Sequence, residues 1–244
     1  MSSPLTARAP RLRGARALFT GRDGGVSTGD HAGLNLARHV GDEEPSVQRN
    51  RALLAAEIGA PLVFVDQIHS ADVHVLPATG EVPVRSADAL VTDRRDVALA
   101  IMVADCLPVL LSDPVAGVVA VAHAGRQGLL TGVLQHTVES MVALGARPED
   151  LEVSIGPSIC GACYEVPAGM RDEAAALLPE TWARTSWGTP SLDLRAGAAA
   201  VLEAAGVPAA SFDMDHPCTL EDERFFSHRR SARTGRFAGV LRRG

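Results

Sequence analysis

The chain has 244 residues, of which 46% are hydrophobic; it can therefore bury a substantial core, and this excludes disorder as its global state. The formal net charge of −6 argues against a nucleic-acid binder that works through a general basic field. No apolar run reaches the roughly 18 to 20 residues that a bilayer-spanning helix needs.

All 23 basic residues are arginine. The absence of lysine excludes Schiff-base catalysis, a lysine general base and the lysine of a phosphate-binding loop. Any anion must therefore be held by arginine, backbone N–H groups or metal. Arginines crowd both ends of the chain, and we expect these ends to be solvated tails; they are Arg8, Arg11, Arg13, Arg16, Arg229, Arg230, Arg233, Arg236, Arg242 and Arg243.

The first residues carry charges with no apolar segment behind them, so we expect no secretory signal and a cytoplasmic protein. Residues 1–13 are expected to be a flexible tail, and residues 14–244 a single catalytic domain, because no long Pro/Gly/Ser linker divides them. In such a chain the four cysteines are expected to be reduced thiols or metal ligands.

Hydrophobic periodicity and turn residues predict short strands that alternate with helices. Strands and helices mixed in this way indicate an α/β or α+β sandwich with a mostly buried sheet. In chain order we expect a helix over 46–58, strands over 62–65, 73–76, 97–103 and 108–111, a turn over 112–117, a strand over 118–122, a helix over 129–144, a strand over 151–155 and a helix over 196–205.

Three of the apolar runs end in a residue that binds metals: His69, Cys106 and His123. Strand ends hold functional groups rigidly at a sheet edge, so these three side chains are expected to converge. Two imidazoles and a thiolate suit zinc, and three protein ligands leave a fourth position open for catalysis. Taken singly, each of these residues is more often a structural histidine or a buried cysteine that behaves as a small hydrophobe.

Two other stretches could bind an anion or a substrate. Small residues after His123 lead into the helix expected next, where backbone N–H groups favour negative charge; a tight turn is the alternative. The glycine-rich loop near the start contains Arg22, which can fork onto a phosphate, and Asn35, which can read a purine edge. An ordinary solvated loop is the alternative there.

The pair Cys160 and Cys163 has the spacing of a redox motif or of half a zinc site. No second pair of this kind occurs in the sequence, so the spacing is a weak indication. The surroundings of His123 also differ from a nucleoside-deaminase signature, because Ala-Gly follows it where that signature has a glutamate.

Together these segments resemble the YfiH/laccase-domain family, described as purine nucleoside phosphorylases and also as polyphenol oxidases. The resemblance covers about residues 17–239 and is carried, in order, by FTGRDGGVSTG, GLNLARHVGD, QIHSADV, ADALVT, VADCLPVLLSDP, AVAHAGRQG, GPSICGACYEV and CTLEDERFFSHRR.

The resemblance implies an α-β-β-α layered sandwich with mixed sheets and a zinc site at His69, Cys106 and His123, with copper as the alternative metal. It implies phosphorolysis of adenosine, inosine and methylthioadenosine, and deamination of adenosine. The expected partners are therefore a purine nucleoside and phosphate, without nucleic acid or membrane, and the chain is expected to be a monomer. The resemblance also places three further residues at the substrate pocket: Arg22, Asn35 and Cys163.

The family usually reads HAGWRG, whereas this chain has Arg126 and Gln127 in place of the Trp-Arg pair. The change removes an aromatic surface and moves the positive charge by one residue, so we expect an altered hold on phosphate and an altered substrate preference. For the proton transfer that deamination requires, Asp105 and Cys163 are the candidates.

Three alternatives remain at this point. A metal-free cysteine hydrolase would use Cys106 as nucleophile, with His123 or His69 as base. A multicopper phenol oxidase would need more histidines, grouped in HxH pairs, than the 8 scattered ones present. The third alternative is a nucleoside-binding protein without activity.

Overall fold

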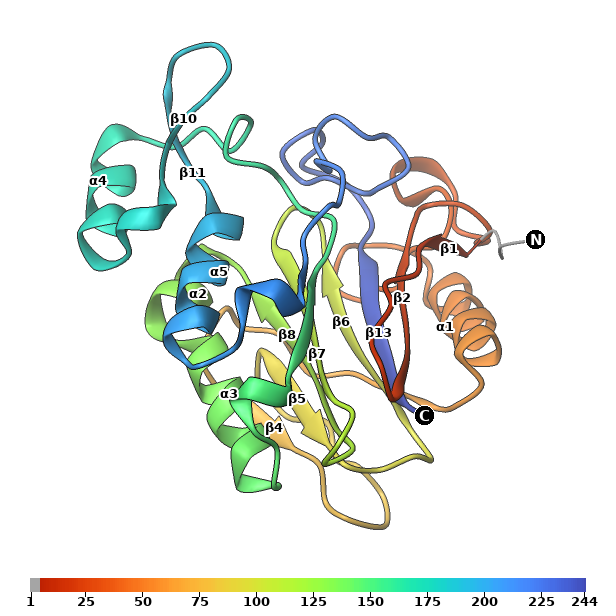
Figure 1. Cartoon of the computed structure of the whole chain (residues 1–244). Coiled ribbons are helices and arrows are strands. Elements are labelled where there is room, and N and C mark those ends of the chain that lie inside the picture. The colour runs from red at the N-terminus through yellow and green to blue at the C-terminus, as the bar shows by residue number, and fades with distance from the viewer. Residues whose placement is uncertain (1–4) are drawn as a thin grey trace.

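Two mixed β-sheets lie face to face and helices cover both outer faces, as Figure 1 shows for a computed structural model that describes residues 5–244. The predicted α-β-β-α order of layers is confirmed. The first sheet has, in spatial order, β1 (Thr6–Arg8), β2 (Ala15–Thr20), β13 (Phe237–Arg243), β6 (Ala98–Val103) and β3 (Leu62–Val63). The second has β12 (Phe212–Asp213), β9 (Glu152–Ile155), β7 (Leu107–Asp113), β8 (Val118–Ala124), β5 (Ala89–Thr92) and β4 (Val73–Val75).

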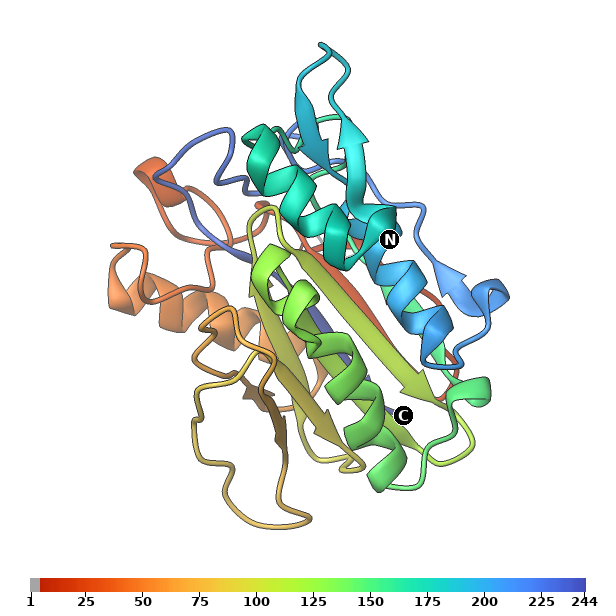
Figure 2. The same ribbon diagram turned by 90° about the vertical axis from the view of Figure 1, so that its left-hand side faces the viewer.

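The outer helices separate by face. Helix α1 (Glu44–Ile58) packs on the first sheet, and α2 (Arg126–Thr131), α3 (Val133–Ala143) and α5 (Leu194–Ala204) cover the second, as Figure 2 shows. Helix α4 (Ala168–Leu177) packs beside the hairpin of β10 (Trp182–Arg184) and β11 (Pro190–Leu192). Four short 3-10 helices complete the list: η1 (Gly29–His31), η2 (Pro148–Asp150), η3 (Pro179–Thr181) and η4 (Ala209–Ser211).

The continuous apolar runs arise because the central strands are buried on both faces. In β6, Leu99 and Ile101 enter the core between the sheets, whereas Ala98 and Ala100 face α1. Strand β8 alternates in the same way, with Val121 in the core between the sheets. Side chains two residues apart share a face of a strand, so His123 also points into the layer between the sheets.

Both ends of the described chain belong to the first sheet, which corrects two expectations. The predicted tail over residues 1–13 is wrong from Leu5 onward, because residues 6–8 pair with β2 and Leu5 and Leu12 are buried; residues 1–4 lie outside the described residues. The arginine-rich C-terminus is not a solvated tail either, because β13 pairs with both β2 and β6.

The helix predicted over 129–144 is two helices. Gly132 has φ of +102°, which ends α2 and begins α3, and a glycine adopts this left-handed conformation without the strain other residues incur. The predicted turn after β7 is confirmed, with Asp113 accepting the backbone N–H groups of Val115 and Ala116. Within residues 5–244, none of the helices combines the length and apolar character that a bilayer span requires.

Candidate metal centre

His69, Cys106 and His123 come together although they are far apart in the sequence. One ligand atom from each lies within 4.8 Å of the other two, and the imidazole rings are 4.7 Å apart at their centroids. The predicted convergence is therefore present in the structure. The donor set has two borderline nitrogens and one sulfur, which is a set that can hold a metal ion.

Each residue reaches the site from a different element. His123 lies near the end of β8, and Cys106 ends the short connection in which the chain leaves β6 of the first sheet and enters β7 of the second. His69 follows β3 in a loop. His69 and Asp105, the neighbour of Cys106, have φ of 60° and 93°, a conformation that costs non-glycine residues of order 1–3 kcal/mol. The fold thus holds two strained residues at this site.

Asp88, which directly precedes β5, holds His123 and the loop of His69 in position through hydrogen bonds. The sequence did not predict this residue. Its fully buried carboxylate accepts the Nδ1 hydrogen of His123 at 2.8 Å and the backbone N–H groups of Ile68, His69 and Ser70. One carboxylate therefore fixes both the ring of His123 and the loop of His69. With its Nδ1 engaged, His123 can bind a metal only through Nε2, which must give up its proton when the metal binds.

The electrostatics of the site favour a thiolate beside an imidazolium. Burial alone would raise the pKa of Cys106, but the charge of His123 and hydrogen bonds from His123 and His69 lower it to about 6. Burial opposes the charged form of His123 too, yet Cys106 and Asp88 raise its pKa to about 9. Asp88 keeps a lowered pKa despite burial, because His123 and Ser70 donate to it.

Position 125, two residues after His123, lacks a side chain because there is little room for one beside the three ligand atoms. A Cβ atom at this position would lie 3.0 Å from Cys106 Sγ, 3.1 Å from His69 Cδ2 and 3.6 Å from His123 Nε2. The missing side chain therefore leaves the space in which the three ligand atoms meet. Helix α2, which Gly125 precedes, is only six residues long, so the anion-binding helix expected here has fewer than two turns.

Cys106 lines two cavities. The first has a volume of about 280 Å³, and the second, of about 150 Å³, shares Ala104, Cys106 and His228 with it. Arg236 lines the first cavity, and its guanidinium donates to the carbonyl oxygens of Thr234 and Gly235. Arg229 lines the second cavity together with Tyr164. From the sequence, Arg229 and Arg236 were expected to lie in a solvated tail, and His228 was not among the expected site residues.

The residues predicted to bind substrate from the N-terminal loop lie elsewhere. Arg22 lines neither cavity, and its guanidinium lies 5.1 Å from the ring centroid of Phe226. Asn35 is fully buried: its Nδ2 donates to the carbonyl of Ala37 and to Asp42, and its Oδ1 accepts the backbone N–H groups of Ala37 and Arg236. Asn35 therefore positions the backbone of a cavity residue instead of facing the cavity.

Asp105 and Cys163, the two candidates for proton transfer, are both otherwise engaged. Asp105 lines the smaller cavity, but its carboxylate accepts the hydroxyl of Thr219 at 2.6 Å and the backbone N–H of Arg229 at 2.7 Å. Cys163 belongs to a different cluster, and burial raises the pKa of its thiol. That cluster joins Cys160 and Cys163 to Cys218, which sequence spacing did not connect with them.

The family model described as multi-copper polyphenol oxidoreductase laccase matches residues 16–243. A Streptomyces griseus protein named purine nucleoside phosphorylase ORF3 is 48% identical over 241 residues, covering 96% of each chain. A Deinococcus radiodurans protein named purine nucleoside phosphorylase is 42% identical and covers 96% of this chain and 91% of its own.

Solved structures show the same fold. The Neisseria meningitidis protein NMB0706 superposes with a TM-score of 0.86 at 38% identity and 98% coverage of both chains. YlmD from Geobacillus stearothermophilus gives a TM-score of 0.87 at 34% identity and 99% coverage of both. Likeness at this level extends over the sheets and the connections that carry the His/Cys cluster.

Proposed function

The chain belongs to the laccase-domain family that includes YfiH and YlmD, and from that premise we propose that it is a zinc-dependent purine nucleoside phosphorylase. The substrates would be adenosine, inosine or methylthioadenosine, together with phosphate. The observation that carries the proposal is the convergence of His69, Cys106 and His123 beside two cavities. The names of the relatives support the reaction class.

The donor atoms fit zinc better than an electron-transfer copper. A mononuclear His₂Cys copper centre adds a weak axial ligand, usually a methionine sulfur. Met102 lines the larger cavity, but its sulfur accepts a contact from Arg51 Nη2 at 3.8 Å, on the side of the strand that faces α1. When bound at the three ligands, zinc would supply a Lewis acid with an open coordination position.

Phosphorolysis needs positioning, charge neutralisation and one proton. A phosphate oxygen forms a bond to C1′ as the bond from C1′ to N9 of the purine breaks, and the base leaves with the electron pair and takes up a proton. Arg236 and Arg229 are the cations that line the cavities, so they are assigned to phosphate and ribose. His228 lines both cavities and is the histidine placed to donate the proton.

The decisive assay incubates the zinc-loaded protein with adenosine and phosphate and separates the products by chromatography. Adenine and ribose 1-phosphate are expected, and omission of phosphate should abolish both. Arg236→Ala should raise the KM for phosphate, whereas Arg233→Ala, an exposed arginine nearby, should leave it unchanged. If the metal-loaded protein gives no products with adenosine, inosine and methylthioadenosine alike, the phosphorylase proposal fails and a nucleoside-binding role is favoured.

Adenosine deamination is a second activity of the same site, and the same chromatogram tests it through inosine. It requires a proton carrier, and neither Asp105 nor Cys163 is free for that role. His228 is the remaining titratable side chain common to both cavities. His228→Gln should therefore lower both activities; loss of only one would separate their proton donors.

The cysteine-hydrolase alternative draws on the same geometry, because a thiol with a pKa of about 6 beside a histidine also describes a nucleophile. The phosphorylase and the hydrolase differ in whether their activity requires a metal ion. Under our proposal chelation removes activity and zinc restores it, and bound zinc protects Cys106 from alkylation. A cysteine hydrolase would instead stay active after chelation and lose activity on alkylation.

A further inference from the structure

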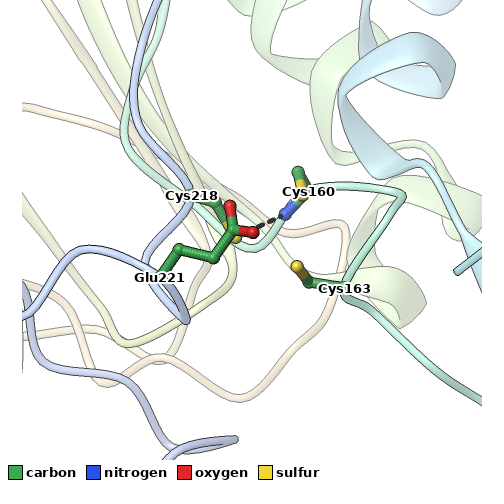
Figure 3. Close-up of side chains that lie close together, drawn as sticks. All are labelled: Cys160, Cys163, Cys218 and Glu221. Carbon is green, nitrogen blue, oxygen red and sulfur yellow. Dashed lines mark hydrogen bonds between the residues drawn. The ribbon is translucent and has the colours of Figure 1, made fainter. Parts of the chain in front are cut away.

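Three sulfurs and a carboxylate meet at a place distinct from the His69 site. Cys160 and Cys163 lie in the loop after β9, and Cys218 and Glu221 lie in the segment after β12, as Figure 3 shows. One ligand atom from each of the four lies within 4.8 Å of all the others. We propose that these residues form a second metal site, which holds a structural zinc ion.

The spacing suits one ion. With Zn–S bonds of about 2.3 Å, tetrahedral geometry places two sulfurs roughly 3.8 Å apart, so groups already within 4.8 Å need only small side-chain adjustments. Four protein ligands close the coordination shell, which is the mark of a structural site. The carboxylate oxygen of Glu221 favours zinc over Cu(I), which prefers thiolates alone.

The backbone already holds the ligands in place. Cys163 and Tyr164 donate their N–H groups to the carbonyl of Cys160, and Glu221 donates to that of Cys218, so each ligand pair sits on a closed turn. The N–H of Cys160 also points at Cys218 Sγ, 3.4 Å away. A hydrogen bond of this kind to sulfur stabilises a metal-bound thiolate.

Charge in the surroundings matches an anionic site. Three thiolates and one carboxylate outweigh the two positive charges of zinc, so a nearby cation is required. Arg195 supplies one: its guanidinium donates to Ser158 Oγ and to the carbonyls of Ser158, His216 and Pro217, all neutral oxygens. The thiol groups of Cys160 and Cys218 lie close enough to influence the pKa of this arginine.

The site would fasten the C-terminal segment against the loop after β9. Apart from the bridge between Ser158 and Cys218, this attachment consists of isolated hydrogen bonds and a small apolar cluster that includes Ile159 and Leu220. The fastened segment also carries Thr219 and Arg229, which hold the two carboxylate oxygens of Asp105 next to Cys106. The second ion would therefore stabilise the fold and indirectly the cavity beside the first.

Metal counting on purified protein tests the proposal without any activity assay. The wild type should bind two equivalents of zinc, Cys106→Ser should lose the first, and Cys160→Ser/Cys163→Ser should lose the second. Because the chain has four cysteines, one at the first site and three at the second, each variant removes thiolates from one site alone. Failure of the nucleoside reaction would leave these counts unchanged.

Cobalt spectroscopy distinguishes the sites directly. Sulfur-to-cobalt charge-transfer absorption grows with the number of thiolate ligands, so the second site should absorb roughly three times as strongly as the first. This absorption should persist in Cys106→Ser and disappear in Cys160→Ser/Cys163→Ser. Glu221→Gln should weaken cobalt binding at this site at least about tenfold, whereas Glu223→Gln, an exposed neighbour, should not.

Three results would overturn the proposal. One is a single equivalent of metal in the wild type and none in Cys106→Ser. Another is alkylation of Cys160, Cys163 and Cys218 at equal rates with and without zinc. The third is a disulfide among these three cysteines in protein purified without reductant, which would indicate a redox pair. If the double cysteine variant does not fold, the wild-type spectrum and Glu221→Gln decide the question.

Discussion

Asp88 connects the two histidines of the metal centre through a single buried carboxylate. Asp88→Asn keeps the shape but offers an amide where His123 Nδ1 now donates, so the ring loses its preferred orientation. We expect metal affinity at the first site to fall about 10- to 100-fold, as for other carboxylates behind ligating histidines. Competition with a chromogenic chelator measures the change, and Asp72→Asn, an exposed neighbour, is the matched control.

The missing side chain of Gly125 leaves space beside the ligand atoms, and a substitution at this position would fill that space. In Gly125→Ala the new methyl group would press on Cys106 Sγ and His69 Cδ2, while the backbone, at φ of −74°, accommodates alanine without strain. We therefore expect metal binding to weaken by tenfold or so, the scale seen when the surroundings of ligands are disturbed, with little change in the melting temperature. A large drop in melting temperature with normal metal content would contradict this.

Asp42 gives a pH-dependent prediction. Its side chain is 5% exposed, and although burial opposes ionisation, hydrogen bonds from Asn35, Ser27 and the backbone of Glu43 lower its pKa; His31 Nδ1 also lies 4.0 Å away. A lowered pKa stabilises the fold fully above the unfolded value near 4 and loses that contribution as pH falls through the folded value.

In Asp42→Asn we expect a loss of about 1–3 kcal/mol at neutral pH, because buried donors lose a charged acceptor. The difference from the wild type should begin to shrink below about pH 4, where Asp42 of the unfolded chain becomes protonated, and should be lost below the lowered pKa of the folded state. Thermal melts across this pH range measure it, with the exposed Glu43→Gln as control. A difference that does not change with pH would refute the assignment.

The convergence of His69, Cys106 and His123 could be predicted from sequence because each follows an apolar run. Asp88 could not, because its partner His123 is 35 positions away and only the pairing of β5 with β8 brings them together. Cys218 could not be predicted for a similar reason: it lies 58 positions from Cys160, and a bridge to Ser158 brings it beside the Cys160–Cys163 pair.

Among the elements, the break between α2 and α3 is the clearest test of the rule that a left-handed position at a helix end favours glycine. Gly132→Ala places a Cβ in a left-handed conformation that costs about 1–2 kcal/mol, and no neighbouring atom lies closer than 3.7 Å to it. We expect that loss of stability in denaturant melts. Gly169→Ala, in open space within α4, should be neutral or stabilising by up to about 1 kcal/mol.

Elements buried on both faces were predictable, whereas those defined by distant pairing were not. Strands β6, β7 and β8 are mostly apolar and fully buried, and the helix predicted over 46–58 ends before Gly59, which adopts the left-handed conformation. Strand β13 has only five apolar or glycine residues before two arginines, so its composition resembles a basic tail. Its position between β2 and β6 comes entirely from long-range hydrogen bonds.

At the scale of the whole molecule, the pattern of strands and helices indicated an α/β or α+β sandwich, whereas the α-β-β-α order of its layers was implied by the family resemblance. The sequence also placed the metal ligands at the sheet edges. It could not show that the chain crosses from one sheet to the other immediately at Cys106, which puts the centre between the two sheets. That crossing depends on how the sheets stack, and periodicity carries no information about stacking.

The position of β13 has a consequence for how the protein is made. Among the strands of the first sheet, β2 and β6 are translated well before β13, which lies between them. During synthesis the first sheet has a gap at its centre, with unpaired strand edges of the kind that invite association with other chains. Nascent chains should therefore depend on chaperones until translation ends.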